Sequence, residues 1–159
     1  MRKSVLVVCS VLLFGSVLLA QNKIETKWKC AKDSAMQKLD VGDMPDHAYA
    51  VAQGTCSATA SESGFDEKSG AYTEFRDMKK AGMSTHGRFL VTMGSGDKVY
   101  YTYANSVPAD IKKPASNKWT IDSGTGKYKG IKGSGVCSGM AHEDGSGDWH
   151  CTGTYTLGK

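Results

Sequence analysis

Short segments in which apolar and polar residues alternate run along most of the chain, with turn-forming clusters between them. Such segments predict β-strands, because successive side chains of a strand point to opposite faces of a sheet. The clusters, such as 94–97 and 143–148, are rich in glycine, serine and aspartate and read as turns. We therefore expect strands at about 24–30, 47–58, 71–78, 85–93, 98–104, 118–121, 134–140 and 149–157.

Seven or eight short strands with frequent turns predict an all-β domain, either a sandwich or a barrel. Residues 31–38 predict one or two helical turns, and 105–116, which contains Pro108 and Pro114, predicts a loop. Strands do not alternate with long helical patterns, so a parallel sheet is not expected. The chain has 159 residues and no dividing linker, which indicates one domain.

The last two expected strands can be aligned residue by residue. If Cys137 lies opposite Cys151, then Gly139 lies opposite Trp149 on the same face, so that a large ring covers a glycine. Directly opposed residues have Cα atoms about 4.5–5.5 Å apart, and a disulfide accepts about 4.4–6.8 Å. The alignment therefore predicts a Cys137–Cys151 disulfide.

The first twenty residues have the pattern of a signal peptide. Arg2 and Lys3 precede a long apolar run, and Ala20 places a small residue at the expected cleavage point. The run is short for a membrane span, which needs about 20 apolar residues. We therefore expect a mature domain at 21–159 that is periplasmic or secreted, with no stable membrane insertion after cleavage.

Cysteine number supports a disulfide-linked domain. The chain has five cysteines, and Cys9 lies in the expected signal peptide, which leaves four. An even number in an exported chain suggests two disulfides, and once Cys137 and Cys151 are paired, Cys30 pairs with Cys56 by elimination. No closely spaced cysteine pair of the zinc-binding type is present, so we expect no metal.

The charge balance is mild. The whole chain has 20 basic and 16 acidic residues, and loss of Arg2 and Lys3 leaves 18 against 16, or a net charge of +2. Such a small excess predicts no nucleic-acid partner. The run 124–127 lacks the glycine that a phosphate-binding loop needs five positions before its Gly-Lys pair, where Ile121 stands. We therefore expect no cofactor.

A glycine-rich segment at 118–135 carries a family resemblance. Its sequence, KWTIDSGTGKYKGIKGSG, resembles the Gly-Thr-Gly-x-Tyr/Phe-x-Gly-x-x-Gly-x-Gly run of allene oxide cyclase-like and dirigent-like barrels. The mature chain also resembles small exported bacterial proteins with this C-terminal signature. The resemblance implies a single antiparallel eight-stranded barrel, calycin-like in form, with a central cavity. No catalytic residue of those families matches here position by position, so their activities are not carried over.

The segment 46–49 holds the most site-like residues. His47 and Tyr49 share a strand face, and an imidazole beside a phenol can transfer a proton or bind a polar ligand. Alternatively, His47 caps a turn and Tyr49 packs at the barrel edge. We favour this second interpretation, because one histidine without a partner specifies no mechanism. With Glu74, these two residues are the candidate catalytic groups.

A second polar cluster is possible at Glu74, Arg76, His86 and Arg88. If their two strands pair, the four side chains line a charged cavity or form a solvated outer face with cross-strand ion pairs. We favour the outer face, because antiparallel sheets commonly keep one face in water. The segment 142–148 is rich in oxygen ligands but lacks the ligand spacing of an EF-hand, so a solvated hairpin loop is expected.

Three functions are compatible with this sequence. We rank first the binding of a small apolar or amphipathic ligand, because an eight-stranded barrel is just wide enough to hold one. Second comes a structural or protein-interaction module of the cell envelope, and third an isomerase or cyclase acting on an apolar substrate. The sequence leaves the oligomeric state open. The candidate ligand-binding residues are Phe89, Tyr100, Tyr101, Tyr103 and Trp119.

Overall fold

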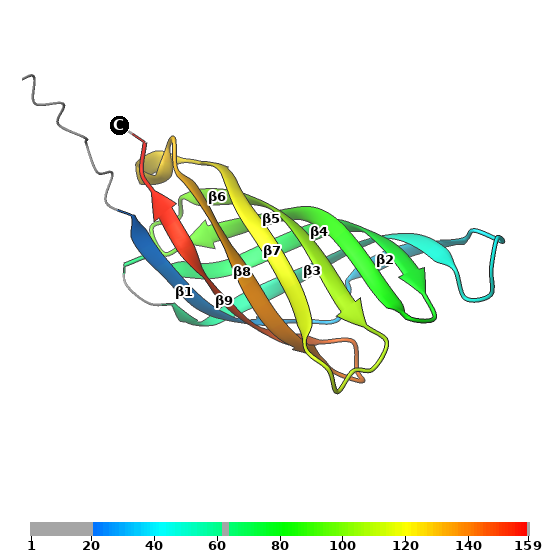
Figure 1. Cartoon of the computed structure of the whole chain (residues 1–159). Helices are drawn as coiled ribbons and strands as arrows, with labels where there is room; N and C mark the ends of the chain where they lie inside the picture. Colours follow the sequence, from blue (N-terminus) through cyan, green and yellow to red (C-terminus); the bar gives the residue numbers. More distant parts are fainter. Residues whose placement is uncertain (1–20, 62–63, 159) are drawn as a thin grey trace, which may run out of the picture.

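The structure is a computed structural model that describes residues 21–61 and 64–158. The signal peptide expected at 1–20 lies outside these residues. The described chain forms strands and one short 3₁₀ helix (Figure 1). These elements are β1 (Asn22–Cys30), β2 (Ala35–Asp40), β3 (Ala48–Ser61), β4 (Glu67–Lys79), β5 (Gly82–Met93), β6 (Lys98–Pro108), β7 (Ala115–Gly124), η1 (Gly126–Tyr128), β8 (Lys132–Ala141) and β9 (Gly147–Thr156).

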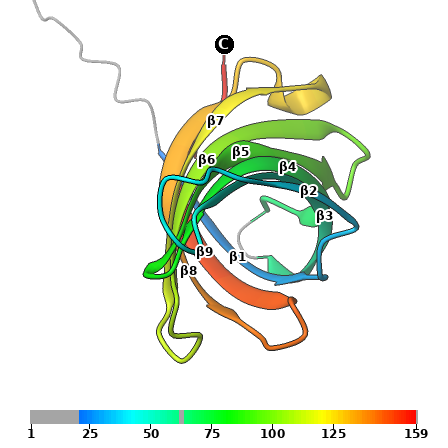
Figure 2. The same ribbon diagram turned by 90° about the vertical axis from the view of Figure 1, so that its right-hand side faces the viewer.

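Eight of the strands close into an antiparallel barrel. Their order is β1-β9-β8-β7-β6-β5-β4-β3, and β1 pairs with β3 to complete the ring. Figure 2 looks into this ring from one end. Closure pairs the strands of the ring on both sides over the barrel itself, and it directs one side chain of every two into the interior. The all-β, eight-stranded barrel that the sequence predicted is confirmed.

The ninth strand, β2, replaces the helical turns expected at 31–38, so that prediction is wrong. β2 pairs with the first half of β3, from Ala35 opposite Gln53 to Asp40 opposite Ala48. β1 pairs only with the second half of β3, where Cys30 lies opposite Cys56. The first half of β3 therefore offers an unpaired edge, and pairing with this edge overrides the weak local preference of the segment.

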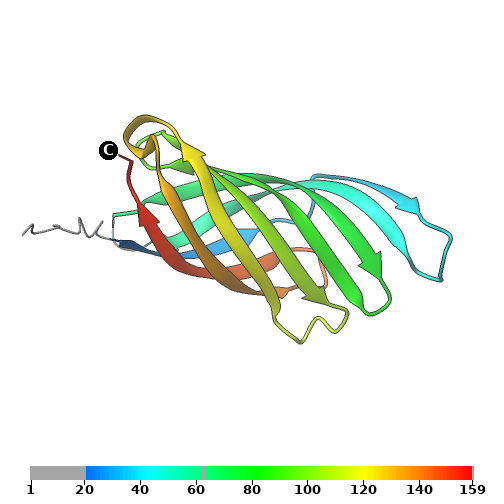
Figure 3. The ribbon, with the colours of Figure 1, turned by 45° about the horizontal axis from the view of Figure 1, so that its top comes forward.

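β2 and its surroundings extend beyond the barrel. We call β2, the loop 41–47 and the first half of β3 the arm; Figures 1 and 3 show it reaching past the ends of the neighbouring strands. All six residues of β2 are exposed. The loop expected at 105–116 is also shorter than predicted, because β6 continues to Pro108 and β7 begins at Ala115. A proline is tolerated at a strand end because no ladder hydrogen bond is lost there.

The last hairpin has the predicted register. Cys137 lies opposite Cys151 and Gly139 lies opposite Trp149. Both disulfides are present, Cys137–Cys151 and Cys30–Cys56. A Cβ atom at Gly139 would lie 2.4 Å from the Trp149 ring, so the ring occupies the space that a side chain would need. The alternation of cysteines, glycines and aromatic rings therefore fixes which residues face the interior.

A second indole, Trp119, covers two glycines that lie opposite each other, Gly135 and Gly153. A Cβ atom at Gly153 would lie 2.4 Å from Trp119 Cζ2 and 2.4 Å from the carbonyl oxygen of Ser134. We expect Gly153→Ala to lower the free energy of unfolding by about 1–3 kcal/mol, as overpacking usually does. Urea unfolding beside the exposed control Thr152→Ala would measure this, and equal stability of the two variants would contradict it.

Candidate functional site

The barrel encloses a cavity of about 350 Å³. Its walls come from most strands of the ring, and residues of the connecting segments at the arm end of the barrel, such as Asp33 and Ser146, also line it. The opposite end is filled with fully buried side chains. These include Phe65, Val91, Met93, Val99 and Ile131. The cavity therefore occupies the half of the barrel that lies toward the arm.

Aromatic rings form most of the apolar wall. Trp28 and Phe89 meet edge to face with their ring centroids 5.1 Å apart. Tyr101 and Trp119 make a similar contact at 5.5 Å. Strand alternation places these rings inside, because they come from inward positions of β1, β5, β6 and β7. Packed rings of this kind present flat, rigid surfaces to a ligand.

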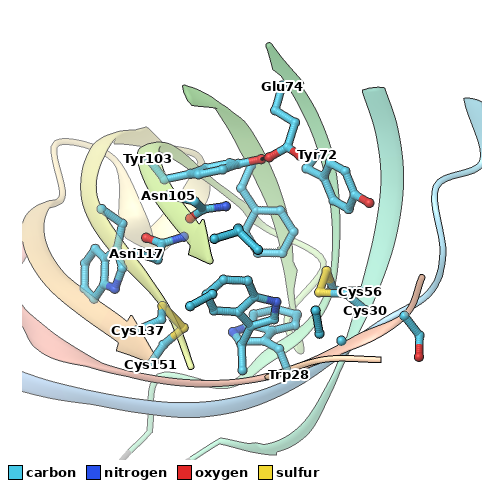
Figure 4. Close-up of a pocket in the computed structure, with 18 of the residues that line it drawn as sticks. Trp28, Cys30, Cys56, Tyr72, Glu74, Tyr103, Asn105, Asn117, Cys137 and Cys151 are labelled. Atoms are coloured by element: carbon cyan, nitrogen blue, oxygen red, sulfur yellow. Dashed lines mark hydrogen bonds between the residues drawn. A yellow bond between two sulfur atoms is a disulfide. The ribbon is translucent and has the colours of Figure 1, made fainter. Parts of the chain in front are cut away.

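Both disulfides belong to the same wall. Cys30–Cys56 and Cys137–Cys151 line the cavity, and Figure 4 shows them on opposite sides of it. Each disulfide ties two neighbouring strands of the ring, β1 to β3 and β8 to β9. Each disulfide also constrains the unfolded chain, and this constraint typically adds about 2–4 kcal/mol to the free energy of unfolding. The disulfides therefore contribute both apolar surface and rigidity to the cavity.

Five polar side chains join into a network at the arm end of the cavity, which we call the mouth network. Arg76 forms two hydrogen bonds with Asp33, at 2.6 Å from Nη1 and 2.7 Å from Nη2. Its Nε donates to Glu74 Oε1 at 2.6 Å. Tyr103 donates to Glu74 Oε2 at 2.7 Å, and Tyr72 donates to Asp33 Oδ1 at 2.7 Å. Figure 4 shows Glu74 between Tyr103 and Tyr72.

The protonation of the mouth network follows from its contacts. Burial, and then Asp33, raises the pKa of Tyr72, while burial and Glu74 raise the pKa of Tyr103. Burial opposes the charge of Arg76, but the two carboxylates outweigh it and raise its pKa. Both phenols therefore stay protonated as donors and the guanidinium stays charged. One cation faces two carboxylates, so the network carries a net charge of −1.

Three buried polar atoms near this network find no hydrogen-bond partner among the described residues. They are the side-chain oxygens of Asn105 and Asn117 and the indole nitrogen of Trp119. Asn105 and Asn117 lie directly opposite each other on β6 and β7, and all three residues line the cavity. An unsatisfied buried polar group costs about 1–3 kcal/mol. The cavity therefore offers polar groups that a ligand could satisfy.

A further carboxyl group, Glu67, lies deeper in the cavity. Its side chain accepts hydrogen bonds from Thr26 Oγ1 at 2.5 Å and from Tyr101 OH at 2.6 Å. Burial raises the pKa of Glu67 from 4.5 to about 7, although both hydrogen bonds act in the opposite direction. Glu67 was not predicted as a site residue because the expected strand began at residue 71, whereas β4 begins at Glu67.

The structure places four of the candidate ligand-binding residues, Phe89, Tyr101, Tyr103 and Trp119, in the cavity wall. Their role in binding stays a prediction. Tyr100 is different: it points away from the cavity and is 37% exposed. Its position follows from strand alternation, because its neighbours Tyr101 and Tyr103 both face inward.

His47 and Tyr49 lie on the outer face of the barrel, away from the cavity. His47 is buried between two carboxylates, with Nδ1 2.5 Å from Asp43 and Nε2 3.0 Å from Asp77. Tyr49 packs against the His47 ring at 5.3 Å and against Phe75 at 5.2 Å. These contacts hold the loop 41–47 on the sheet, and they separate the pair from Glu74, the third candidate catalytic residue.

The second polar cluster is divided between the two faces of the sheet. β4 and β5 pair, but Glu74 and Arg76 point into the cavity, whereas His86 and Arg88 are exposed on the outside. The expectation of one solvated outer face is therefore wrong for Glu74 and Arg76. Charged side chains can line this wall because each of them has an oppositely charged partner in the mouth network, which offsets the cost of burying the charge. Arg88 forms an outer ion pair with Asp122.

The segment 142–148 comprises the connection between β8 and β9 and the first two residues of β9, and in it His142 contacts Asp148 at 2.9 Å and Asp144 accepts from the Ser146 hydroxyl at 2.6 Å. Within the described ranges, no three histidine, cysteine, aspartate or glutamate side chains are grouped to hold a metal ion. In the same ranges, no helix has the length and apolar character that crossing a membrane requires.

Comparison with known proteins identifies the fold. No family model and no curated protein matches the chain. The structure of the pterocarpan synthase dirigent protein GePTS1 is similar, with a TM-score of 0.53 at 11% identity, over 99% of this chain and 100% of that chain. The pterocarpan synthase dirigent protein PsPTS1 gives 0.54 at 10% identity, over 88% and 97%. The chain thus has the dirigent-like barrel fold that its glycine-rich segment predicted, while the bacterial part of the resemblance stays a prediction.

Proposed function

We propose that the protein is an exported binding protein that holds one small amphipathic molecule inside its barrel. The apolar body of the ligand would lie between the aromatic rings of the wall, and its polar end would point to Asn105 and Asn117. The observation that carries this proposal is the cavity itself, in which rings and disulfides surround two half-buried asparagines whose side-chain oxygens find no hydrogen-bond partner among the described residues.

The size and charge of the cavity narrow the ligand class. A volume of about 350 Å³ is at the lower end of ligand pockets, which span about 300–1,000 Å³. The net negative charge of the mouth network disfavours anionic groups, so we expect a neutral or cationic polar end. The fold neighbours are named pterocarpan synthases, which supports small-molecule chemistry in a barrel of this shape.

Two observations support export. Disulfides persist in oxidising compartments, and both pairs of the four cysteines in the described chain are bonded. The pattern at residues 1–20 is that of a secretory signal. We therefore place the mature protein in the periplasm or outside the cell.

Titration with the neutral fluorescent dye N-phenyl-1-naphthylamine tests whether the cavity binds apolar molecules. We expect saturable binding of one dye per chain, because a cavity of about 350 Å³ can enclose one small aromatic molecule. Ala115→Trp, which adds an indole to the cavity wall, should weaken this binding at least roughly tenfold by overfilling the space. Ala104→Trp, on the exposed face of β6, is the matched control. Absence of binding to the wild type, or equal binding by both variants, would contradict the proposal.

The two amides provide a prediction about selectivity. We expect the double variant Asn105→Leu/Asn117→Leu to bind 1-naphthol more weakly, by roughly three- to tenfold for each hydrogen bond lost. Naphthalene, which has no hydroxyl group, should bind the variant as well as the wild type. Competition against the fluorescent dye measures both affinities. An equal loss of affinity for 1-naphthol and for naphthalene would show that the amides do not recognise a polar group.

A second candidate function, an isomerase or cyclase acting on an apolar substrate, is favoured by one observation. Glu74 is only 6% exposed and lines the cavity with Tyr103, so an acid–base group lies within reach of a bound molecule. In that case, Glu74→Gln would abolish turnover of the substrate and preserve dye binding. A purely structural role in the envelope, which a solidly filled interior would favour, has less support because the barrel encloses a cavity.

A further inference from the structure

β2 has one edge that no strand of the described chain covers. It pairs on one side with β3, and it ends the order of strands in the sheet. The backbone N–H of Val41 donates to the carbonyl oxygen of His47, which directly precedes β3. Because hydrogen-bonded and non-hydrogen-bonded pairs alternate along an antiparallel ladder, the N–H and C=O groups of the odd-numbered residues of β2 point toward β3. The backbone N–H and C=O groups of Met36, Lys38 and Asp40 therefore point to the open side. Such a row of groups is a template for another strand.

The charges on β2 select one way in which the strand can pair with a second copy of itself. In an antiparallel ladder between two copies of β2, even-numbered residues must pair with even-numbered residues, because their N–H and C=O groups point to the open side. The numbers of two paired residues then have an even sum, so the two-fold axis passes through a residue and not between two residues. A two-fold axis through Lys38 or through Asp40 places two like charges opposite each other. Centring on Gln37 leaves both charges without a partner. Only centring on Leu39 places Lys38 of each copy opposite Asp40 of the other.

The outer face of the arm supports the same register. Leu39 is 76% exposed, and it lies directly opposite Tyr49, which is 40% exposed. Val51, on the same face, is 50% exposed and lies opposite Phe75 on β4. Pairing centred on Leu39 would bring the two Leu39 side chains together on this apolar face and continue it from one copy to the other. Contiguous apolar surface of this kind marks an interaction site.

We propose that the protein forms a two-fold dimer through antiparallel pairing of β2, centred on Leu39, so that the sheets of two arms become continuous. Lys38 and Asp40 of one chain lie 3.4 Å apart, with half or more of each side chain exposed. An exposed pair of this kind contributes little to stability, so exchanging it for two pairs between chains sacrifices little. The short strand predicts a dimer that dissociates on dilution. This inference is independent of the ligand in the cavity.

The competing interpretation is that the charges on β2 prevent pairing, as they do on many sheet edges. Charge exchange separates the two. Lys38→Glu and Asp40→Lys each place like charges opposite each other in the dimer, and each should raise the dimer dissociation constant at least roughly tenfold. An equimolar mixture of the two variants should dimerise again, because opposite charges then face each other between unlike chains. Sedimentation equilibrium measures the dissociation constants of the wild type, of the two variants and of their mixture. A monomeric wild type, or a mixture no tighter than its components, would overturn the proposal.

A cross-linking experiment tests the register. Leu39 is the one residue that the proposed axis places opposite itself, at a spacing that suits a disulfide. Leu39→Cys should therefore give a covalent dimer on mild oxidation, whereas Gln37→Cys, which would lie opposite Val41, should stay monomeric. Far-UV circular dichroism reports whether each variant keeps the β-sheet fold of the wild type. Equal cross-linking of the two variants, or none in Leu39→Cys, would overturn the register.

Discussion

The variant Glu67→Gln should be more stable than the wild type at pH 8, by on the order of 3 kcal/mol. Burial raises the pKa of Glu67 from 4.5 to about 7 in the folded protein, so the folded state holds this proton more tightly than the unfolded state. Below pH 4.5 the carboxyl group is protonated in both states and contributes no pH dependence. As the pH rises from about 4.5 to about 7, only the unfolded state releases the proton, and the wild type loses stability.

Urea unfolding at a series of pH values measures this effect. The wild-type free energy of unfolding should carry a downward slope between about pH 4.5 and 7 that the variant lacks. Glutamine at this position keeps an oxygen for Tyr101, and its amide can donate to Thr26. Glu143→Gln, in the exposed hairpin loop, is the control and should retain the slope. Parallel curves for the wild type and Glu67→Gln would contradict the burial of this carboxyl group.

Arg76→Met should be strongly destabilising, by about 3 kcal/mol, which is the lower end of the range for breaking a buried ion pair. The change removes the guanidinium that contacts both Glu74 and Asp33. Glu74 is 6% exposed, so its carboxylate would be left charged in a site that water hardly reaches. Asp33 is partly exposed and is solvated more easily, which is why we expect the lower end of the range.

A double-variant cycle isolates this cause. Glu74→Gln/Arg76→Met removes the uncompensated charge and should recover a large part of the stability that Arg76→Met loses. Arg88→Met is the matched control, because its ion pair with Asp122 lies on the outer face and should contribute less than about 1 kcal/mol. Urea unfolding at pH 7 measures the stabilities of the wild type, Glu74→Gln, Arg76→Met, the double variant and Arg88→Met. A loss in Arg76→Met no larger than that in Arg88→Met would contradict the buried network.

The register of the last hairpin could be predicted from sequence because several residues constrain it at once. Cys137 opposite Cys151 and Gly139 opposite Trp149 agree on the same alignment, and a shift by one residue would turn every one of these side chains to the other face. β2 could not be predicted, because residues 35–40 lack a strand pattern. The strand forms because β3 extends beyond β1 and leaves an edge to pair with.

The aromatic wall could be predicted, but the polar end of the cavity could not. Alternation in β6 and β7 identifies Tyr101, Tyr103 and Trp119 as inward residues once the barrel is assumed. Glu74 and Arg76 were assigned to the outer face, because polar residues of a sheet usually face water. Asp33, which pairs with Arg76, lies in the segment where helical turns were expected. A partner so distant in the sequence leaves no local signal.

A crystal structure of the protein with N-phenyl-1-naphthylamine would test the binding proposal most directly. We predict that the naphthalene rings lie inside the barrel against Trp28 and Phe89, with the amine toward Asn105 and Asn117. Dye bound only on the outer face of the arm, with none inside the barrel, would contradict the proposal.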